Sequence, residues 1–421
     1  KDLFGKTALH NAAHYNGKET AELLISHGAN IDEKDQFGRT ALHHASCKNN
    51  NEIVEFLISH GANINEKDND GRTALQYAAR YNYKETAELL ISHGANINEK
   101  DQYGQTAIQY AARYNYKETA ELLISLGANI NVKDKYEKTS LQYAARYNYK
   151  ETAELLISHG ANINEKNKYG KTALQYAVLN NSKETVELLI LLGAKINNKD
   201  NDGKTALHIA ASCNYIEIAE FLISHGANIN EKDKCGKTAL HIASRTTKEM
   251  VELLISHSAN INEKDNDGRT ALQYAARYNY KETAELLISH GANINEKDND
   301  GRTALQYAAR YNYKETAELL ISHGANINEK DQYGQTAIQY AARYNYKETA
   351  ELLISHGANI NVKDKCGKTA QHYAACNNCK EIIELLISHG ANINEKDKYG
   401  ETYLFYASIK HYKRGHFTKI D

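Results

Sequence analysis

Arginine and tyrosine stand side by side six times in this sequence, always within the segment "RYNYKE". The segment begins at Arg80, Arg113, Arg146, Arg277, Arg310 and Arg343. Arginine and tyrosine are among the residues most enriched at positions that dominate protein–protein binding, because both join a large contact surface to hydrogen-bond donors. The pairs therefore either line a binding surface or serve structure alone, with the tyrosine covering a helix end and the arginine solvated.

Three other patterns suggest chemical sites, but each lacks a required part. The segment "EKDNDG" is similar to the start of a calcium-binding loop. With Gly71 at the sixth position of such a loop, Tyr77 would stand at the twelfth, where a glutamate must complete the coordination of the ion. Histidine follows "IS" ten times, and such histidines in neighbouring repeats would lie about 8–10 Å apart, which is too far for a shared zinc ion bound at about 2 Å. Cys376 and Cys379 have a CxxC spacing but no second pair. We expect no metal and no cofactor.

The sequence also lacks the motifs of common enzymes. It contains no phosphate-binding loop, no nucleophile elbow and no HExxH segment. Catalysis needs one asymmetric pocket, which near-identical repeats do not supply. The sequence therefore predicts a protein that is not an enzyme.

Charge and composition narrow the class of partner. The chain has 421 residues and a formal net charge of −2, so it has no overall basic field that would attract nucleic acid. No apolar run approaches the roughly 18–20 residues that span a bilayer, and no signal segment opens the chain. The six cysteines are sparse and irregular, which favours a reducing compartment. We expect a monomer in the cytosol or nucleus that inserts into no membrane and binds no nucleic acid.

The arginine–tyrosine pairs belong to a longer repeat. A threonine before "AL" or a variant of it returns every 33 residues, with one step of 32 between Thr238 and Thr270. A fixed period of this length predicts one stacked array over residues 1–421. The repeats begin near residues 2, 35, 68, 101, 134, 167, 200, 233, 265, 298, 331, 364 and 397, the last of them partial.

Each repeat reads as two short helices. In the repeat from residue 68, Thr73 followed by Gln76 predicts a capping box, so a helix begins at Ala74. Asn82 can end this helix in the left-handed conformation, and Gly94 can end the second one in the same way. Helices of about two turns are unstable alone, so each depends on its neighbours.

The repeat resembles the ankyrin repeat. The positions that carry the resemblance are Asp68, Gly71, Thr73, Leu75, Ala78, Ala79, Glu85, Leu89, Leu90, Gly94, Ala95 and Asn98. The family usually has proline and histidine where Ala74 and Gln76 stand here. The resemblance implies an all-α solenoid of helix-turn-helix units, joined by β-hairpin-like loops into a curved superhelix.

The resemblance also implies a binding surface, because ankyrin repeats usually bind partners on the concave side formed by first helices and loop tips. Tyr77 and Tyr83 are instead expected to pack between repeats. The implied partner-binding residues are Asn69, Asp70, Arg72, Arg80, Tyr81, His93, Tyr103, Arg113, Tyr114, Arg146, Tyr147, Arg277, Tyr278, Arg302, Arg310, Tyr311, Tyr333, Arg343 and Tyr344.

The best functional hypothesis is a non-catalytic scaffold that binds a partner protein along this surface. The alternatives are a structural spacer or elastic tether, and a targeting module of a larger protein. Residues 58–125 are identical to residues 288–355, so two similar surfaces, roughly 68–166 and 265–363, suit a bivalent partner. We expect the short repeat 233–264 to be the weakest, and the tail after Ala407 to shield the terminal face.

Overall fold

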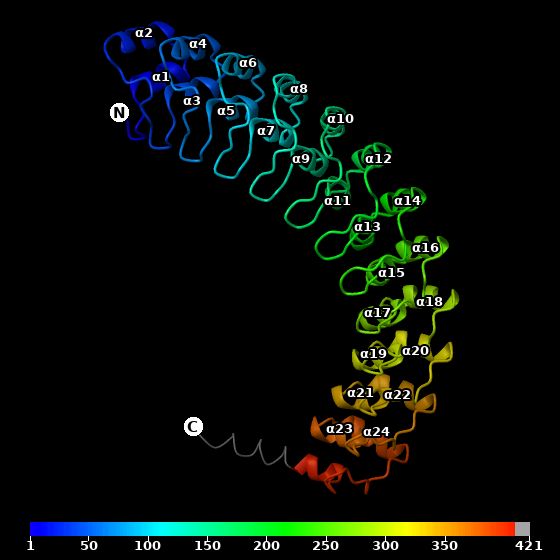
Figure 1. Ribbon diagram of the computed structural model, residues 1–421. Helices are drawn as coiled ribbons and strands as arrows, with labels where there is room; N and C mark the ends of the chain where they lie inside the picture. Colours follow the sequence, from blue (N-terminus) through cyan, green and yellow to red (C-terminus); the bar gives the residue numbers. More distant parts are fainter. Residues whose placement is uncertain (409–421) are drawn as a thin grey trace, which may run out of the picture. The chain divides into compact units, whose positions relative to one another are not determined.

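The computed structural model describes residues 1–408 (Figure 1). It divides into two compact units, residues 1–209 and residues from 210 onward, called here the N-terminal half and the C-terminal half. Within residues 1–408 the chain consists of helices, turns and loops, with no β-strand. The fold is therefore an all-α repeat solenoid.

Each repeat supplies a first helix of five to eight residues and a second helix of nine. The first helices are α1 (Ala8–His14), α3 (Ala41–Ser46), α5 (Ala74–Arg80), α7 (Ala107–Arg113), α9 (Ser140–Arg146), α11 (Ala173–Leu179), α13 (Ala206–Cys213), α15 (Ala239–Ala243), α17 (Ala271–Tyr278), α19 (Ala304–Arg310), α21 (Ala337–Tyr344) and α23 (Ala370–Cys376). The second helices are α2 (Lys18–Ser26), α4 (Asn51–Ser59), α6 (Lys84–Ser92), α8 (Lys117–Ser125), α10 (Lys150–Ser158), α12 (Lys183–Leu191), α14 (Ile216–Ser224), α16 (Lys248–Ser256), α18 (Lys281–Ser289), α20 (Lys314–Ser322), α22 (Lys347–Ser355) and α24 (Lys380–Ser388). Residues 403–408 are also helical.

The start of the first helix follows the prediction. Helix α5 begins at Ala74, and the Gln76 side chain accepts a hydrogen bond of 2.9 Å from the backbone N–H of Thr73. The Gln76 amide also donates to the carbonyl of Glu99 at the end of its own repeat, at 2.9 Å, and to that of Gln105 in the next repeat, at 2.8 Å. Glutamine thus caps its own helix and links two repeats.

The ends of both helices also follow the prediction. Asn82 has a φ of 62° and Gly94 a φ of 93°, both in the left-handed region. The Asn82 side chain accepts a hydrogen bond of 2.7 Å from Thr119 Oγ1 in the next repeat. Asparagine is therefore favoured over glycine at the first helix end, because its side chain links neighbouring repeats.

The core lies between two rows of helices (Figure 1). In the N-terminal half, each first helix packs on the next first helix, and each second helix on the next second helix. Leu75, Ala78 and Ala79 of α5 and Ala87 and Leu90 of α6 are buried. The small alanines let the helices approach closely, so each repeat is stabilised by its neighbours rather than by a central core.

The loops between repeats are turns, and no β-strand is assigned to them within residues 1–408. Gly71 has a φ of 75°, and a Cβ atom there would lie 2.8 Å from the backbone nitrogen of Gln102. That nitrogen donates a hydrogen bond of 2.9 Å to the carbonyl of Asp70. Because one backbone bond joins neighbouring loop tips, the tips are aligned tight turns and no strand ladder forms.

The short repeat 233–264 has a distinct first-helix end. Helix α15 has only five residues, and Ser258 takes the left-handed position with a φ of 67°. Thr246 replaces the usual asparagine, and its hydroxyl donates back to the carbonyl of Ala243 in the same repeat. The asparagine–threonine link to the following repeat is therefore not made here.

The C-terminal tail was expected to shield the terminal face of the array. Most of it, residues 409–421, lies outside the described residues.

Candidate functional site

The arginine–tyrosine pairs lie at the C-terminal ends of first helices. Arg80 is the last residue of α5, and Tyr81 follows it as the cap. The Arg80 guanidinium carbon lies 5.9 Å from the centroid of the Tyr81 ring, in cation–π range. The other five pairs repeat this contact at 5.7–5.9 Å. We call the surface formed by the three pairs of each half the Arg/Tyr face of that half.

A second tyrosine supports the first. The rings of Tyr81 and Tyr83 lie 6.1 Å apart, and those of Tyr114 and Tyr116 lie 6.0 Å apart and are stacked. Tyr83, expected between repeats, is half-buried beside Tyr81, which remains 45% exposed. The stack orients an accessible ring and reduces the conformational entropy that it loses on binding.

The Arg/Tyr face of the N-terminal half contains an open pocket of about 400 Å³, called here the N-terminal pocket. It spans the repeats that begin at residues 68, 101 and 134. It is lined by Arg72, Arg80, Tyr103, Gln105, Tyr110, Arg113, Tyr114, Asp134, Tyr136, Lys138, Tyr143, Arg146 and Tyr147.

The N-terminal pocket carries positive charge that the protein does not neutralise. Within residues 1–408, no carboxylate lies within 4 Å of the guanidinium groups of Arg80, Arg113 and Arg146. The ammonium of Lys138 faces the rings of Tyr143 and Tyr176, with centroids at 5.6 and 5.5 Å. Burial and repulsion by Arg146 lower the pKa of Lys138. An anion in this pocket would relieve that repulsion.

Buried hydrogen bonds fix the wall of the N-terminal pocket. Arg72 Nε donates to Tyr110 Oη at 3.2 Å, and Tyr110 Oη donates to Asp101 Oδ2 at 2.6 Å. Asp101 Oδ1 accepts the backbone N–H groups of Tyr103 and Gln105 in the turn, each at 2.8 Å. Burial and the hydrogen bond to Asp101 raise the pKa of Tyr110. The tyrosine therefore stays neutral and joins the loop of one repeat to the helix of the next.

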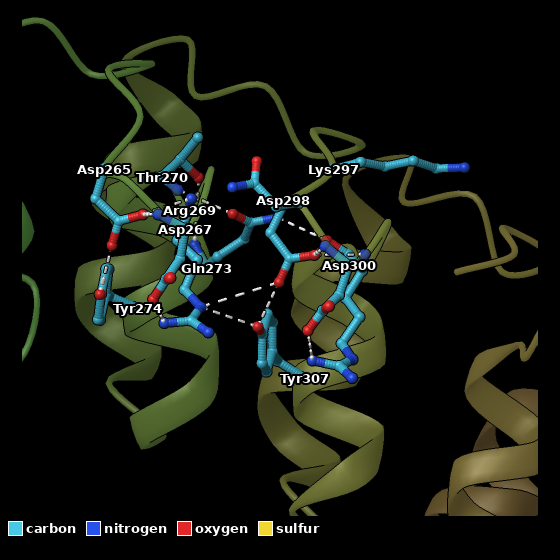
Figure 2. A network of polar contacts seen from close by, with 12 residues as sticks. Asp265, Asp267, Arg269, Thr270, Gln273, Tyr274, Lys297, Asp298, Asp300 and Tyr307 are labelled. Atoms are coloured by element: carbon cyan, nitrogen blue, oxygen red, sulfur yellow. Dashed lines mark hydrogen bonds and ion pairs between the residues drawn. The ribbon is translucent and has the colours of Figure 1, made fainter. Parts of the chain in front are cut away.

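Figure 2 shows the same network in the C-terminal half. Arg269 points from its own repeat toward Tyr307 and Asp298 of the next one. Its Nε atom donates to Tyr307 Oη at 3.1 Å, and Tyr307 Oη donates to Asp298 Oδ2 at 2.5 Å. The Arg269 guanidinium also pairs with Asp267 at 2.6 Å. Because both partners hold this arginine, it serves the array and is less available to a ligand.

A second open pocket, called here the C-terminal pocket, has a volume of about 320 Å³. It lies on the repeats that begin at residues 298, 331 and 364. It is lined by Arg302, Arg310, Tyr333, Gln335, Tyr340, Arg343, Tyr344, Asp364, Lys365, Cys366 and Tyr373. The third of these repeats, which begins at residue 364, carries Cys376 and Asn377 in place of the arginine–tyrosine pair.

Comparison with known families identifies the repeats. The family model for ankyrin repeats, in three copies, matches residues 1–68, 65–134, 95–167, 141–233, 226–298, 291–364 and 357–416. The chain belongs to the ankyrin-repeat family. A comparison with curated proteins finds no match. Ankyrin repeats are generally protein–protein interaction modules, which makes the exposed part of this array the place to seek a partner site.

Two further properties of the ankyrin array concern sites and membranes. Within residues 1–408, no three histidine, cysteine or acidic side chains are grouped as a metal site would require. Over the same residues, every helix is too short or too polar to cross a membrane.

The two pockets of the ankyrin array bring together most of the expected partner-binding residues. In the N-terminal half these are Arg72, Arg80, Tyr103, Arg113, Tyr114, Arg146 and Tyr147. In the C-terminal half they are Arg302, Arg310, Tyr333, Arg343 and Tyr344. Four further residues, each on the Arg/Tyr face of its own half, line neither pocket: Tyr81, Arg277, Tyr278 and Tyr311.

Three expected residues have other contacts. His93 ends the second helix, where its Nδ1 lies 2.9 Å from the carbonyl oxygen of Leu89. The Asn69 amide donates to the carbonyl of Gln36 in the preceding repeat at 2.9 Å. Asp70 pairs with Arg72 and accepts a hydrogen bond from Gln102 at 2.8 Å. These contacts stabilise the ankyrin loops and helix ends whether or not a partner is bound.

Six residues of the N-terminal pocket were not among the expected binding residues, and they include Tyr136, Lys138 and Tyr143. Tyr136 occupies the position of Tyr103 in the next repeat, and Lys138 that of Arg72 two repeats on. Shifting the implied positions forward by one period finds Tyr136, and a shift by two periods finds Lys138. Tyr143 occupies the position of Tyr77, which was expected to pack between repeats; it is buried and also lines the pocket.

Proposed function

We propose that this ankyrin array is a non-catalytic scaffold that binds a partner protein along its Arg/Tyr face. The observation that carries the proposal is the row of exposed tyrosines beside arginines without carboxylate partners, which lines both pockets. A rigid aromatic ring and a guanidinium together supply much of the energy of typical protein interfaces.

The contacts within the face also support binding. Tyr81 is held between Arg80 and Tyr83, with ring distances of 5.9 and 6.1 Å. A side chain ordered before binding loses less entropy on binding, so more of its contact energy appears as affinity. A tether selected only for length would need no such surface.

Four tyrosine substitutions test the proposal: Tyr81→Ala, Tyr114→Ala, Tyr311→Ala and Tyr344→Ala in one chain. Proteins captured from a cell lysate by the wild type are compared quantitatively with those captured by the variant. Partners of the face should be lost, because each hot-spot ring contributes about 1–4 kcal/mol to binding. Circular dichroism should show unchanged helix content.

A matched control removes exposed apolar side chains from the second helices: Leu23→Ala, Leu126→Ala, Leu191→Ala and Leu192→Ala. These side chains are 42–73% exposed and lie outside both pockets. The control should retain the captured partners. Equal capture by the wild type and both variants would contradict binding through the Arg/Tyr face and favour a spacer.

A further inference from the structure

The free cations of the Arg/Tyr face recur at equal steps. Arg80, Arg113 and Arg146 each end the first helix of a successive repeat, and these helices pack side by side. Packed helices lie about 8–10 Å apart, so the three guanidinium groups form a row with that step. Arg277, Arg310 and Arg343 occupy the same positions in the C-terminal half.

The row favours a ligand with several negative charges. The three guanidinium groups of the N-terminal half contact tyrosine rings and, within residues 1–408, have no carboxylate partner. The carboxylate nearest in the lining, Asp134, is already occupied: its oxygens accept Tyr143 Oη at 2.6 Å and two turn N–H groups. Acidic side chains on a bound segment would therefore meet the row without competition.

The step of the row matches one backbone conformation well. Polyproline II has three residues per turn and a rise of about 3.1 Å per residue, so every third side chain lies on one face about 9 Å from the last. In a β-strand the third side chain points to the opposite face, since its period is two. An α-helix needs about seven residues to advance as far. Polyproline II segments also bind in grooves lined by aromatic rings, as this one is.

We propose that the arginine row of each half binds an acidic protein segment in the polyproline II conformation, with aspartate or glutamate at every third residue. The carboxylates meet successive arginines, and the intervening residues lie against the parts of the tyrosine rings that the protein leaves exposed. This inference rests on the proposed function, because it names the chemistry of the partner that the Arg/Tyr face binds.

Single-stranded nucleic acid is the other polyanion that an aromatic, basic groove binds, by stacking bases on open ring faces. Here the Tyr81 ring already contacts Arg80 and Tyr83, and the Tyr114 ring contacts Arg113 and Tyr116. Ring faces in contact with the protein leave less room for stacked bases. The structure therefore favours the acidic peptide.

The probe is a fluorescein-labelled peptide, (Glu-Pro-Pro)4, titrated with the full chain and followed by anisotropy. We expect it to bind with two peptides per chain and to weaken as salt rises, since the contacts are ionic. Two comparison peptides keep the length: (Gln-Pro-Pro)4, and a proline-rich peptide with four glutamates at every second position. Both should bind at least about tenfold more weakly. The first has no negative side chains, and the second has glutamates whose spacing does not match that of the arginines.

Two variants locate the binding. The first replaces six arginines by glutamine: Arg80→Gln, Arg113→Gln, Arg146→Gln, Arg277→Gln, Arg310→Gln and Arg343→Gln. The matched control removes the same charge four residues further on: Lys84→Gln, Lys117→Gln, Lys150→Gln, Lys281→Gln, Lys314→Gln and Lys347→Gln. The arginine variant should lose at least about tenfold in affinity and the lysine variant less than about twofold.

Several results would overturn the inference. Equal binding of the two glutamate spacings, equal loss in the two variants, or tighter binding of a helical peptide with glutamate at every seventh residue would contradict it. So would tighter, arginine-dependent binding of a twelve-residue oligothymidylate. If (Glu-Pro-Pro)4 fails to bind while tyrosine-dependent capture of proteins persists, the inference alone falls. Loss of that dependence would remove the proposed function too.

Discussion

The N-terminal and C-terminal pockets share two walls and differ in the third. The shared walls come from residues 58–125 and their identical copy 288–355. The third wall comes from the next repeat, which supplies Arg146 and Tyr147 among others in the N-terminal half, whereas Cys376 and Asn377 at the same positions of the C-terminal half do not line its pocket. The volumes are about 400 and 320 Å³. A pocket in this array therefore belongs to a run of repeats, and copying part of the run does not copy the whole site.

The buried tyrosine–aspartate hydrogen bonds are the same in the two pockets, although the surface residues differ. Tyr143 and Tyr373 both donate to the aspartate of their own repeat, at 2.6 and 2.5 Å. Both also accept a hydrogen bond from the glutamine of the preceding repeat. The third repeat of each pocket thus keeps the links between repeats even where its surface residues change. The comparison separates residues that hold the array from residues that contact a ligand.

The largest expected effect is the loss of the fold at alkaline pH. Burial and a hydrogen bond to an aspartate raise the pKa of Tyr77 and of Tyr340 to about 12, from an ordinary value of 10.0. Between about pH 10 and pH 12 the unfolded chain releases these protons while the folded chain keeps them, so the free energy of unfolding falls as pH rises. Melting temperatures from circular dichroism should drop steeply above about pH 10. The Tyr340→Phe variant should show a smaller drop, and a slope that it leaves unaltered would contradict this role.

The next effect compares the two identical copies directly. Tyr110→Ala and Tyr340→Ala each remove a buried ring and a link to the preceding repeat, so each should destabilise its region by about 3–5 kcal/mol. The measurement is the free energy of opening of nearby amides, from hydrogen exchange. Because the surrounding residues are identical, the two losses should agree. A difference above about 1 kcal/mol would show that more distant repeats decide local stability.

Exchanging the third walls should shift affinity between the halves. Cys376→Arg with Asn377→Tyr adds a fourth pair to the row of the C-terminal half and should tighten binding of (Glu-Pro-Pro)4 there by about threefold to tenfold. Arg146→Cys with Tyr147→Asn should weaken binding in the N-terminal half by a similar factor. Each half is measured while glutamine replaces the arginines of the other row. No change in either direction would mean that the third wall is not part of the site.

The smallest effect concerns the short repeat 233–264. Ser258→Gly should stabilise it by about 1 kcal/mol, because glycine adopts a φ of 67° with less strain than serine. Hydrogen exchange in residues 233–264 should slow about fivefold, starting from faster exchange than in residues 298–363. The matched control is Gly291→Ser in the next repeat, at a φ of 90°, which should speed exchange there. Uniform exchange across both regions would contradict a weak repeat.

The elements of the fold could be predicted from the sequence because their signals are local. Thr73 and Gln76 are three residues apart, and Asn82 and Gly94 act through their own backbone conformations. Such positions require no knowledge of the neighbouring repeat. Their repetition then places every helix within residues 1–408 to within a residue or two.

The links between repeats could not be predicted in the same way. Arg72 bonds to Tyr110, 38 residues away, and Gln76 bonds to the carbonyl of Gln105, 29 residues away. Which side chains meet depends on how the helices of neighbouring repeats pack, and the 33-residue period alone does not determine this packing. For the same reason Arg72 looked like a free surface arginine, although its Nε atom is bound to Tyr110 of the next repeat. The loops between repeats contain tight turns with their own backbone hydrogen bonds, and the single backbone bond between neighbouring loop tips is too few for a strand ladder.

The sequence separation of these hydrogen-bonded residues affects how a gene that encodes such repeats can change. The bonds between repeats described here join residues 29 to 38 positions apart, so each reaches only the adjacent repeat. Recombination that adds or removes a whole number of repeats would leave every remaining repeat with a neighbour of the same kind. The identical segments 58–125 and 288–355 are the kind of homologous tract at which unequal crossing-over occurs. A change of repeat number in such a gene therefore need not pass through an unfolded protein, and the length of the array can change one period at a time.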